Sequence, residues 1–559
     1  MTLDVIDQAV ISQGLIAAAR EMGSKLVRSA FSTVVREAAD ASAALLDPKG
    51  RTVAQAEMIP MHLGSMAATF EACARHHPPE GLSEGDFYLS NDPYEGGQHL
   101  PDVYIFSPVF LSGRLIGFAA SVAHHLEMGG AAAGIVANAT DIYQEGLRLP
   151  PSCWNLERHW HGGPLQRLVA ANIRVPRLTI GDFNAQFAAN ALGAERLVNL
   201  ATRYGVDRIG DAMTELIAYS ERRMRREISA VPDGTWHGED AVDDDGIHDE
   251  PLPVRVAITI DGDRIEADFA GTAGEVTRNL NSPLSSTASA TYAAIKATLT
   301  SPDIPFNHGM TQPVTLHVPY PSLLNPKPPA PVHARMEACY RVYNAVMKAL
   351  AGAVPERVAA CGYDTTTALT MTRFDGRHYQ VVTEVLGGGY GASTNGDGES
   401  ALASPLANCT NTPVEALDLD YAFFRLRAWS LRTDSGGAGR HRGGLGYERV
   451  YEVLEPGSAL TLYADRFRLA PAGLFGGHDG RRASCRVERN GRIIDVASKA
   501  MMPLEVGDIV TIRTGGGAGY GAPCERDPGL VDDDVGEGYV SVVSARRHHG
   551  WHGVAVQGR

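Results

Sequence analysis

Four residues that can bind a metal ion lie close together in the sequence, namely His99, Asp102, His124 and His125. Imidazole nitrogens and a carboxylate oxygen are ligands that suit Zn²⁺, Mn²⁺ or Fe²⁺. The alternative is that they are polar residues at strand ends that hydrogen-bond to loop backbone, which is the safer interpretation for any single histidine. Because four candidates converge on one place, the pattern favours a divalent metal site.

The convergence depends on a predicted β-hairpin. Two apolar runs, 103–110 and 115–123, are separated by Leu111-Ser112-Gly113-Arg114. This segment has the length and the residue types of a hairpin loop. The hairpin therefore gathers the candidate ligands at the end opposite its turn.

The pairing within this hairpin decides which side chains meet. With the turn centred on Ser112-Gly113, antiparallel pairing places Asp102 opposite Ala123 and Pro101 opposite His124. Adjacent strand residues face opposite sides of a sheet, so only one of the two neighbouring histidines is expected to coordinate the ion. The other is expected to bind substrate or to support the ligands.

A second hairpin is predicted between residues 42 and 56, with its turn at Asp47-Pro48-Lys49-Gly50. Proline and glycine at these turn positions are typical of a type I turn. The same register argument places Glu37 and Asp40 near His62. If the two hairpins share a sheet, either acid is a candidate for a further ligand or a general base, and the alternative is a solvated strand end.

The remaining pattern indicates several domains, because 559 residues are too many for one core. Apolar residues at helical spacing predict helices over 5–33, 63–77, 182–226 with a break near Gly205, 285–299 and 337–351. Beyond about residue 370 strands and turns dominate. We expect a multidomain α/β (mixed α+β) protein with metal-bearing hairpins in an N-terminal α/β domain (1–230), a mixed middle domain (231–370) and a β-rich C-terminal domain (371–559).

Composition excludes several classes of function. A hydrophobic content of 44% with 21% charged residues is ordinary for a globular protein. The net charge of −15, without a dense basic cluster, argues against nucleic-acid binding. No apolar run reaches the length of a membrane span and the N-terminus lacks a basic secretion signal, so we expect a cytoplasmic protein without a membrane partner. The seven cysteines include no CxxC pair, which favours reduced thiols.

The sequence also argues against a nucleotide site in this chain. Residues 515–521 have glycines at dinucleotide-loop spacing, but they lead into Ala522-Pro523-Cys524 instead of a helix that would bind the phosphates. No GxxxxGK[ST] phosphate loop and no GxSxG nucleophile motif occur. We therefore expect no nucleotide cofactor here and metal-assisted chemistry.

The chain resembles the hydantoinase B/oxoprolinase family from its first helix to Glu537-Gly538-Tyr539-Val540-Ser541. The motifs that carry the resemblance are Glu37-Ala38-Ala39-Asp40-Ala41-Ser42, Ile59-Pro60-Met61-His62-Leu63-Gly64, Asn91-Asp92-Pro93-Tyr94 through Asp102, Ala123-His124-His125, Ile142-Tyr143-Gln144-Glu145-Gly146-Leu147, Asn411-Thr412-Pro413-Val414-Glu415, Asp434-Ser435-Gly436-Gly437-Ala438-Gly439 and Gly443-Gly444-Leu445-Gly446.

The resemblance implies a B-type subunit of an ATP-dependent hydrolase that acts on a cyclic amide such as a hydantoin, 5-oxoproline or another lactam. It also implies an A-type ATPase partner with an actin-like fold, which binds ATP and Mg²⁺ and phosphorylates the amide oxygen, in a hetero-oligomer such as a heterotetramer. Carboxylases of acetone and acetophenone share this subunit type, so a carboxylase subunit stays an alternative. A non-catalytic scaffold for the ATPase is another.

The resemblance and the hairpin together imply roles for the candidate residues. The expected metal ligands are His99, Asp102, His124 and, as the fourth, Asp40. The expected groups for proton transfer are Glu37, His62 and His125. One departure from the family is Glu127, at a position where relatives often carry aspartate, and its longer side chain argues against a ligand role.

Overall fold

The computed structural model describes residues 4–56, 58–407 and 409–553, which form two compact units. Unit 1 comprises the chain up to His237 together with Arg255–Arg335, and unit 2 comprises Gly238–Val254 and the chain from Met336 onward. The first two boundaries fall within β7 (Gly234–Val242) and β8 (Leu252–Asp261). The three domain ranges predicted from the sequence stay a prediction.

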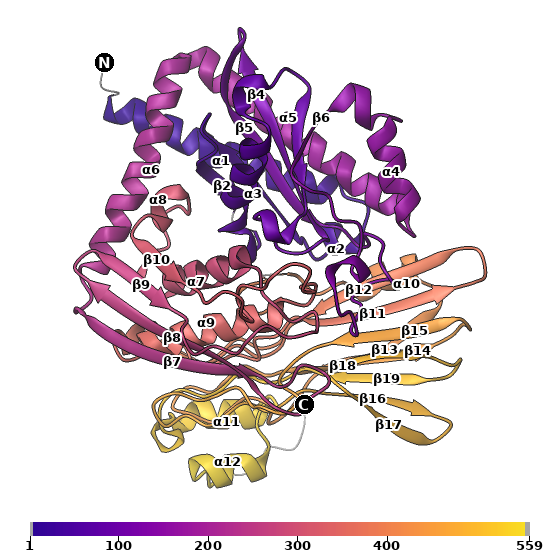
Figure 1. Ribbon diagram of the computed structural model, residues 1–559. Coiled ribbons are helices and arrows are strands. Elements are labelled where there is room, and N and C mark those ends of the chain that lie inside the picture. The colour runs from indigo at the N-terminus through magenta and orange to yellow at the C-terminus, as the bar shows by residue number, and fades with distance from the viewer. Residues whose placement is uncertain (1–3, 57, 408, 554–559) are drawn as a thin grey trace. The chain divides into compact units, whose positions relative to one another are not determined.

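Unit 1 is built on a six-stranded antiparallel sheet with the strand order β2-β1-β5-β4-β3-β6, of which Figure 1 labels β2, β5, β4 and β6. Its strands are β1 (Ala41–Leu46), β2 (Thr52–Ala56), β3 (Asp86–Ser90), β4 (Asp102–Leu111), β5 (Arg114–His124) and β6 (Ser152–Asn155). The two predicted hairpins are β1–β2 and β4–β5, and they share this sheet because β1 pairs with β5. Their strand ends therefore lie side by side.

Helices cover both faces of this sheet. Apolar residues of α1 and α5 pack on one face, and α3 packs on the other. Side chains along β4 point alternately to the two faces. Tyr104 and Phe106 belong to the core under α3, whereas Val103 and Ile105 belong to the core under α5. The helices of unit 1 are α1 (Val5–Ser29), α2 (Thr33–Arg36), α3 (Ser65–His76), α4 (Pro164–Asn172), α5 (Pro176–Tyr204), α6 (Val206–Ile228), α7 (Leu284–Leu299) and α8 (His308–Thr311).

The predicted helices are confirmed, including the break at Gly205, where α5 ends and α6 begins. Gly205 has a φ of 93°, a backbone conformation that glycine adopts without strain. A second sheet has the order β10-β9-β8-β7 and adds β9 (Arg264–Asp268) and β10 (Val314–His317). No helix among the described residues is both long and apolar enough to cross a lipid bilayer.

Unit 2 is rich in strands, as predicted for the C-terminal half. Two sheets, β12-β11-β15-β18 and β13-β14-β19-β16-β17, contribute side chains to one shared core. The strands are β11 (Thr367–Phe374), β12 (Tyr379–Leu386), β13 (Phe424–Leu431), β14 (Tyr447–Val453), β15 (Ser458–Tyr463), β16 (Ser484–Arg489), β17 (Arg492–Val496), β18 (Lys499–Pro503) and β19 (Ile509–Arg513). The helices are α9 (Met336–Leu350), α10 (Val414–Asp420), α11 (Pro528–Gly536) and α12 (Val542–His549).

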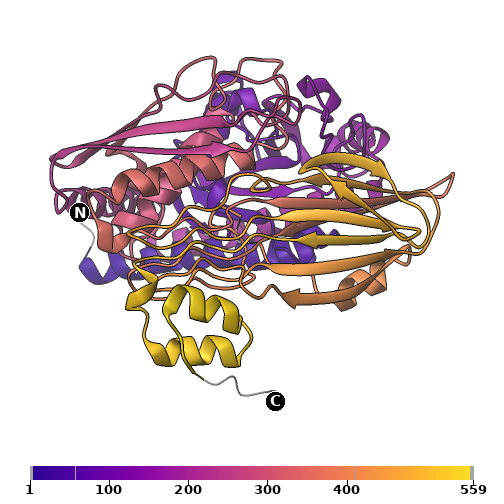
Figure 2. The same cartoon turned by 90° about the horizontal axis from the view of Figure 1, so that it is seen from below.

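Beside these sheets, four glycine-rich segments pack backbone against backbone, and we call them the glycine bundle: 387–391, 436–446, 473–480 and 515–521. Figure 2 shows extended segments without helix or strand near α11 and α12. A Cβ atom on Gly517 would lie 1.8 Å from the carbonyl oxygen of Tyr390. Cross-segment hydrogen bonds join the backbones, such as Gly517 N–H to the oxygen of Gly444 at 2.9 Å. The glycines at 515–521 are thus packing residues, and a three-residue 3-10 turn, Pro523–Glu525, follows before α11 begins at Pro528.

Candidate metal centre

The candidate centre lies where β4 begins and β5 ends. Asp102 is the first residue of β4 and pairs directly with His124, the last residue of β5. Directly opposed residues of an antiparallel pair point to the same face, so these two side chains meet. Both lie on the face that carries α3, as do the even-numbered core residues Tyr104 and Val122.

The predicted register was wrong by one residue. The turn is correct, with Leu111 opposite Arg114, but the pairing shifts between Val109 and Phe110. The shift leaves Ile116 without a partner on β4, which is the arrangement of a β-bulge. As a result Asp102 faces His124 instead of Ala123, and the two candidate ligands come closer than the unbulged hairpin would allow.

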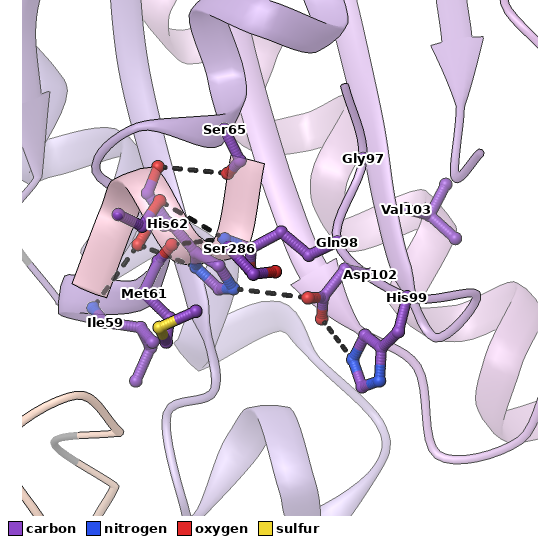
Figure 3. Close-up of polar contacts among 12 residues, drawn as sticks. Ile59, Met61, His62, Ser65, Gly97, Gln98, His99, Asp102, Val103 and Ser286 are labelled. Atoms are coloured by element: carbon purple, nitrogen blue, oxygen red, sulfur yellow. Dashed lines mark hydrogen bonds and ion pairs between the residues drawn. The ribbon is translucent and has the colours of Figure 1, made fainter. Parts of the chain in front are cut away.

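His99 joins this pair from the loop before β4. One atom each of His99, Asp102 and His124 lie within 4.8 Å of one another, and this is the group among the described residues that could hold a metal ion. His99 Nε2 lies 3.1 Å from Asp102 Oδ1 (Figure 3). His99 Nδ1 lies 3.0 Å from the backbone oxygen of His333.

These contacts fix the tautomer of His99. A carbonyl oxygen can only accept a hydrogen bond, so Nδ1 carries the proton and a neutral ring presents a lone pair at Nε2. Burial lowers the pKa of His99, which favours the neutral ring. A lone pair facing a carboxylate oxygen at 3.1 Å is repulsive unless a cation lies between them. The arrangement therefore fits a bound divalent ion.

Unpaired polar atoms support this fit. Among the described residues, four buried atoms without a hydrogen-bond partner gather here: His99 Nε2, Asp102 Oδ1, His124 Nδ1 and His333 Nδ1. Buried polar atoms are nearly always paired, so such a cluster requires an explanation. Two or three nitrogens with one carboxylate oxygen are the donor set of Zn²⁺, Mn²⁺ or Fe²⁺ sites.

Asp102 is held in place from its other oxygen. Arg335 Nη2 donates to Asp102 Oδ2 at 2.6 Å and also to Gln98 Oε1 at 3.1 Å. Burial alone would raise the pKa of Asp102, but the Arg335 guanidinium acts to lower the pKa of this carboxyl. Asp102 is consequently ionised, with Oδ2 bound to Arg335 and Oδ1 turned to the centre.

His62 approaches Asp102 from the opposite side to His99, as Figure 3 shows. Its Nε2 lies 3.9 Å from Asp102 Oδ2, and its Nδ1 lies 3.1 Å from Ser42 Oγ. Burial lowers the pKa of His62 to about 4. Burial likewise lowers the pKa of His124 to about 3. Both rings are therefore neutral at pH 7, the form in which imidazole accepts a proton or binds a metal.

The other predicted site residues are placed differently. The backbone oxygen of Asp40 accepts a hydrogen bond from His124 N–H at 3.0 Å. Burial and the Asp102 carboxylate raise the pKa of Asp40 to about 8, and the Asp40 side chain is not in the group within 4.8 Å. Its role as a fourth ligand stays a prediction. Glu37 lies 2.6 Å from Arg36 and is not brought into the group.

His125 points to the other face of the sheet. Its ring lies 4.3 Å from the ring of Phe183 on α5, measured between centroids, and its Nε2 lies 3.0 Å from Gln186 Oε1. The structure therefore separates His125 from His124, as the alternation of strand residues predicts. Glu127 pairs with Arg174 at 2.6 Å and accepts the Gly129 N–H, which agrees with the argument against a ligand role.

Two residues of the site, His333 and Arg335, were not found from the sequence. They follow a proline-rich stretch, 326–331, and are more than 200 positions from the hairpin. Hydrogen-bond and pairing signals in a single sequence are local, so nothing in it connects the two regions. The run of prolines, which favours a rigid extended segment, is the one available signal.

Comparisons with known proteins give a consistent result. A family model described as Hydantoinase B/oxoprolinase matches residues 4–523. Caprolactamase subunit beta from Pseudomonas jessenii is 31% identical over 571 residues, which cover 98% of this chain and 96% of that protein. The crystal structure of the ATP-dependent caprolactamase from Pseudomonas jessenii has a TM-score of 0.92 and 29% identity, and the match covers 100% of this chain and 98% of that chain.

A nucleotide-free structure of acetone carboxylase also matches, with a TM-score of 0.89 and 18% identity. This match covers 98% of this chain and 79% of that chain. At this level of identity the likeness shows a shared fold, and it does not distinguish a hydrolase from a carboxylase.

Proposed function

Since the chain belongs to the hydantoinase B/oxoprolinase family, we propose that it is the B-type subunit of an ATP-dependent hydrolase of cyclic amides. The substrate class comprises hydantoins, 5-oxoproline and other lactams. An A-type ATPase partner would bind ATP and Mg²⁺ and phosphorylate the amide oxygen. The name of the caprolactamase relative, which is a beta subunit, supports a partner of this kind.

The observation that carries the proposal is the unpaired cluster at the start of β4. His99, Asp102 and His124 would hold a divalent ion, with Asp40 as the proposed fourth ligand. Such an ion supplies a Lewis acid and lowers the pKa of a water molecule toward neutrality. Burial lowers the pKa of His99, His124 and His333, which favours their neutral rings. Neutral rings suit this role, because protonated imidazole cannot bind a metal.

The surrounding residues have distinct roles in this proposal. Arg335 orients the Asp102 carboxylate, leaving one oxygen for the ion. His62, neutral and anchored by Ser42, is the proposed acceptor for the proton of the attacking water. Water then attacks the amide carbon, whose resonance has been broken by phosphorylation of its oxygen. The C–N bond breaks as the ring nitrogen takes up a proton, and a second water hydrolyses the resulting acyl phosphate to a carboxylate and inorganic phosphate. His125, which the sequence suggested for proton transfer, packs on α5, and this proposal gives it no role in the reaction.

Metal analysis of the purified chain tests the proposal first. We expect about one tightly bound divalent ion per chain, and loss of that ion in His99→Ala with the fold retained. A non-catalytic scaffold would need no stoichiometric ion, so a folded wild-type chain that binds no divalent metal would contradict the proposal.

Substrate assays on the chain co-expressed with its partner test the reaction. We expect ATP-dependent ring opening of a lactam that does not require bicarbonate. Turnover of a ketone that depends on bicarbonate would instead identify a carboxylase subunit. The same assay is run on the complex that contains the His99→Ala variant. Loss of activity in this complex, with activity in the wild-type complex, would connect the reaction to this centre.

A further inference from the structure

The motif Ile142-Tyr143-Gln144-Glu145-Gly146-Leu147 has no part in the chemistry described above. It contains a single helical turn, Ile142–Gln144, that begins at Asp141, whose side chain accepts the Tyr143 and Gln144 N–H groups. Glu145 follows this turn and is 2% exposed. A buried acidic side chain requires partners, and the partners of Glu145 identify its role.

The carboxylate of Glu145 binds backbone amides from a remote segment. Glu145 Oε1 accepts the N–H of Val332 at 2.9 Å and the N–H of His333 at 2.9 Å. Glu145 Oε2 also lies 3.1 Å from the Val332 nitrogen. Two backbone N–H groups that converge on one side-chain oxygen fix the position of the segment that carries them. Glu145 therefore fixes the backbone at residues 332 and 333.

This short segment controls the geometry of the candidate centre. The backbone oxygen of His333 accepts the Nδ1 proton of His99, which sets the His99 tautomer. The His333 ring lies 5.2 Å from the His99 ring, edge to face, with Nδ1 buried and unpaired among the described residues. Two residues further on, Arg335 holds Asp102. Each of these contacts depends on where the backbone at 332–335 lies.

The neighbouring contacts keep the same segment in place. Ile142 N–H donates to the Pro329 oxygen at 2.9 Å, and the Tyr94 hydroxyl donates to the Ala330 oxygen. Leu100, Ile142 and Val332 form a small apolar cluster beside these bonds. Glu145 is the acidic residue of this anchor.

From these contacts we propose that Glu145 is a positioning residue of the metal centre. It binds no ion itself, and it acts by holding the 332–335 segment so that His99 presents Nε2, Asp102 presents Oδ1 and His333 faces the centre. This inference rests on the proposed function, because it requires that the centre bind a metal.

Metal affinity is the decisive measurement, since a residue that only stabilises the fold would not change it. The full-length chain is stripped and titrated with Zn²⁺ against a chromophoric chelator, and Co²⁺ is used to record the visible absorption of the bound ion. For Glu145→Ala we expect an affinity about 10-fold to 100-fold lower and a changed Co²⁺ spectrum, as for other residues that orient ligands. Glu145→Gln, which keeps one acceptor oxygen, should lose less.

Glu127 supplies the matched control. It is also buried, at 3% exposure, and it also accepts backbone N–H groups, from Gly129 at 2.7 Å and Arg174 at 2.6 Å. Its partners do not include residues 332–335. Glu127→Gln should therefore lower the melting temperature as Glu145→Gln does, and leave the Zn²⁺ affinity within about twofold.

The possible outcomes separate the inference from the proposed function. If the wild-type chain binds Zn²⁺ and folded Glu145→Gln and Glu145→Ala bind it equally well with an unchanged Co²⁺ spectrum, the inference is wrong and the proposed function stands. If Glu145→Ala does not fold, Glu145→Gln alone decides the matter by the same criteria. If the wild-type chain binds neither metal, both the proposed function and the inference fail.

Discussion

His124 and His125 show how one position along a strand decides the role of a side chain. The two residues are identical in type and adjacent in sequence, but the sheet separates them. His124 faces Asp102 beneath α3, whereas His125 packs on Phe183 of α5. A residue type alone therefore does not identify a ligand, and the face of the strand must be known.

This difference predicts opposite results for two alanine variants. His124→Ala removes a nitrogen ligand and should strip the metal from a chain that still folds. His125→Ala removes a buried ring and its hydrogen bond with Gln186, so it should keep the metal and lower the stability by about 1–3 kcal/mol. Metal content and melting temperature are measured for both. Metal loss in His125→Ala with retention in His124→Ala would show that the strand faces are assigned wrongly.

A buried acid in unit 2, Glu337, predicts a pH dependence of stability. Burial and the carboxylate of Asp465 raise the pKa of Glu337 to about 8, although Arg341 and Lys499 act in the opposite direction. Thr365 donates a hydrogen bond to its Oε2 at 2.6 Å. Because the folded state holds this proton more tightly than the unfolded state, stability present below pH 4.5 is lost as the pH rises through about 8.

The variant Glu337→Gln keeps the shape but cannot lose a proton. Its melting temperature should be close to that of the wild type near pH 4.5 and should rise relative to the wild type toward pH 8. The limit for a single proton is about 1.4 kcal/mol per pH unit. A constant difference between the two proteins across this pH range would contradict the raised pKa.

For helices and strands, the sequence predicts the features that depend on neighbouring residues, namely helix positions and hairpin turns. Helical spacing located α1, α3, α5, α6, α7 and α9, and turn residues located both hairpins. The predicted pairing of β4 with β5 was wrong by one residue, because nothing in the apolar run 115–123 indicates the bulge at Ile116. His333 and Arg335 were missed because their segment reaches the centre through Glu145 and Asp102, contacts that span almost 200 residues or more.

The glycine bundle gives a prediction for two glycines of unit 2. Gly517→Ala would place a Cβ atom 1.8 Å from a backbone oxygen, so the segments cannot pack and the chain should lose most of its soluble, folded yield. Gly536, at the end of α11, does not have a positive φ, and a Cβ atom added to it would meet no heavy atom within 4 Å. Gly536→Ala should keep or slightly raise the melting temperature. Equal stability of the two variants would show that the bundle is not closely packed.

For the whole molecule, the proposed function places nucleotide chemistry on a partner chain. No GxxxxGK[ST] motif occurs, and the glycines at 515–521 lie in close backbone packing. Under the proposed division into an ATPase and a hydrolytic subunit, this chain would need no phosphate loop of its own.

The isolated chain should therefore bind no ATP in the micromolar range and turn over no lactam, and activity should require the co-expressed partner. Isothermal titration calorimetry with ATP and Mg²⁺ tests the first part, and a lactam assay with and without the partner tests the second. Micromolar ATP binding by the isolated chain would refute this division of roles.

The glycine bundle has one further consequence, for the exchange of amide hydrogens with solvent. A glycine-rich stretch in a sequence is usually taken for a flexible linker, and linker amides exchange rapidly with deuterated water. In the bundle the N–H groups of Gly389, Gly437, Gly444 and Gly517 are all bonded to carbonyls of neighbouring segments. Their deuterium uptake should consequently be slow, comparable to that of core strands, because they become accessible only when the surrounding unit opens.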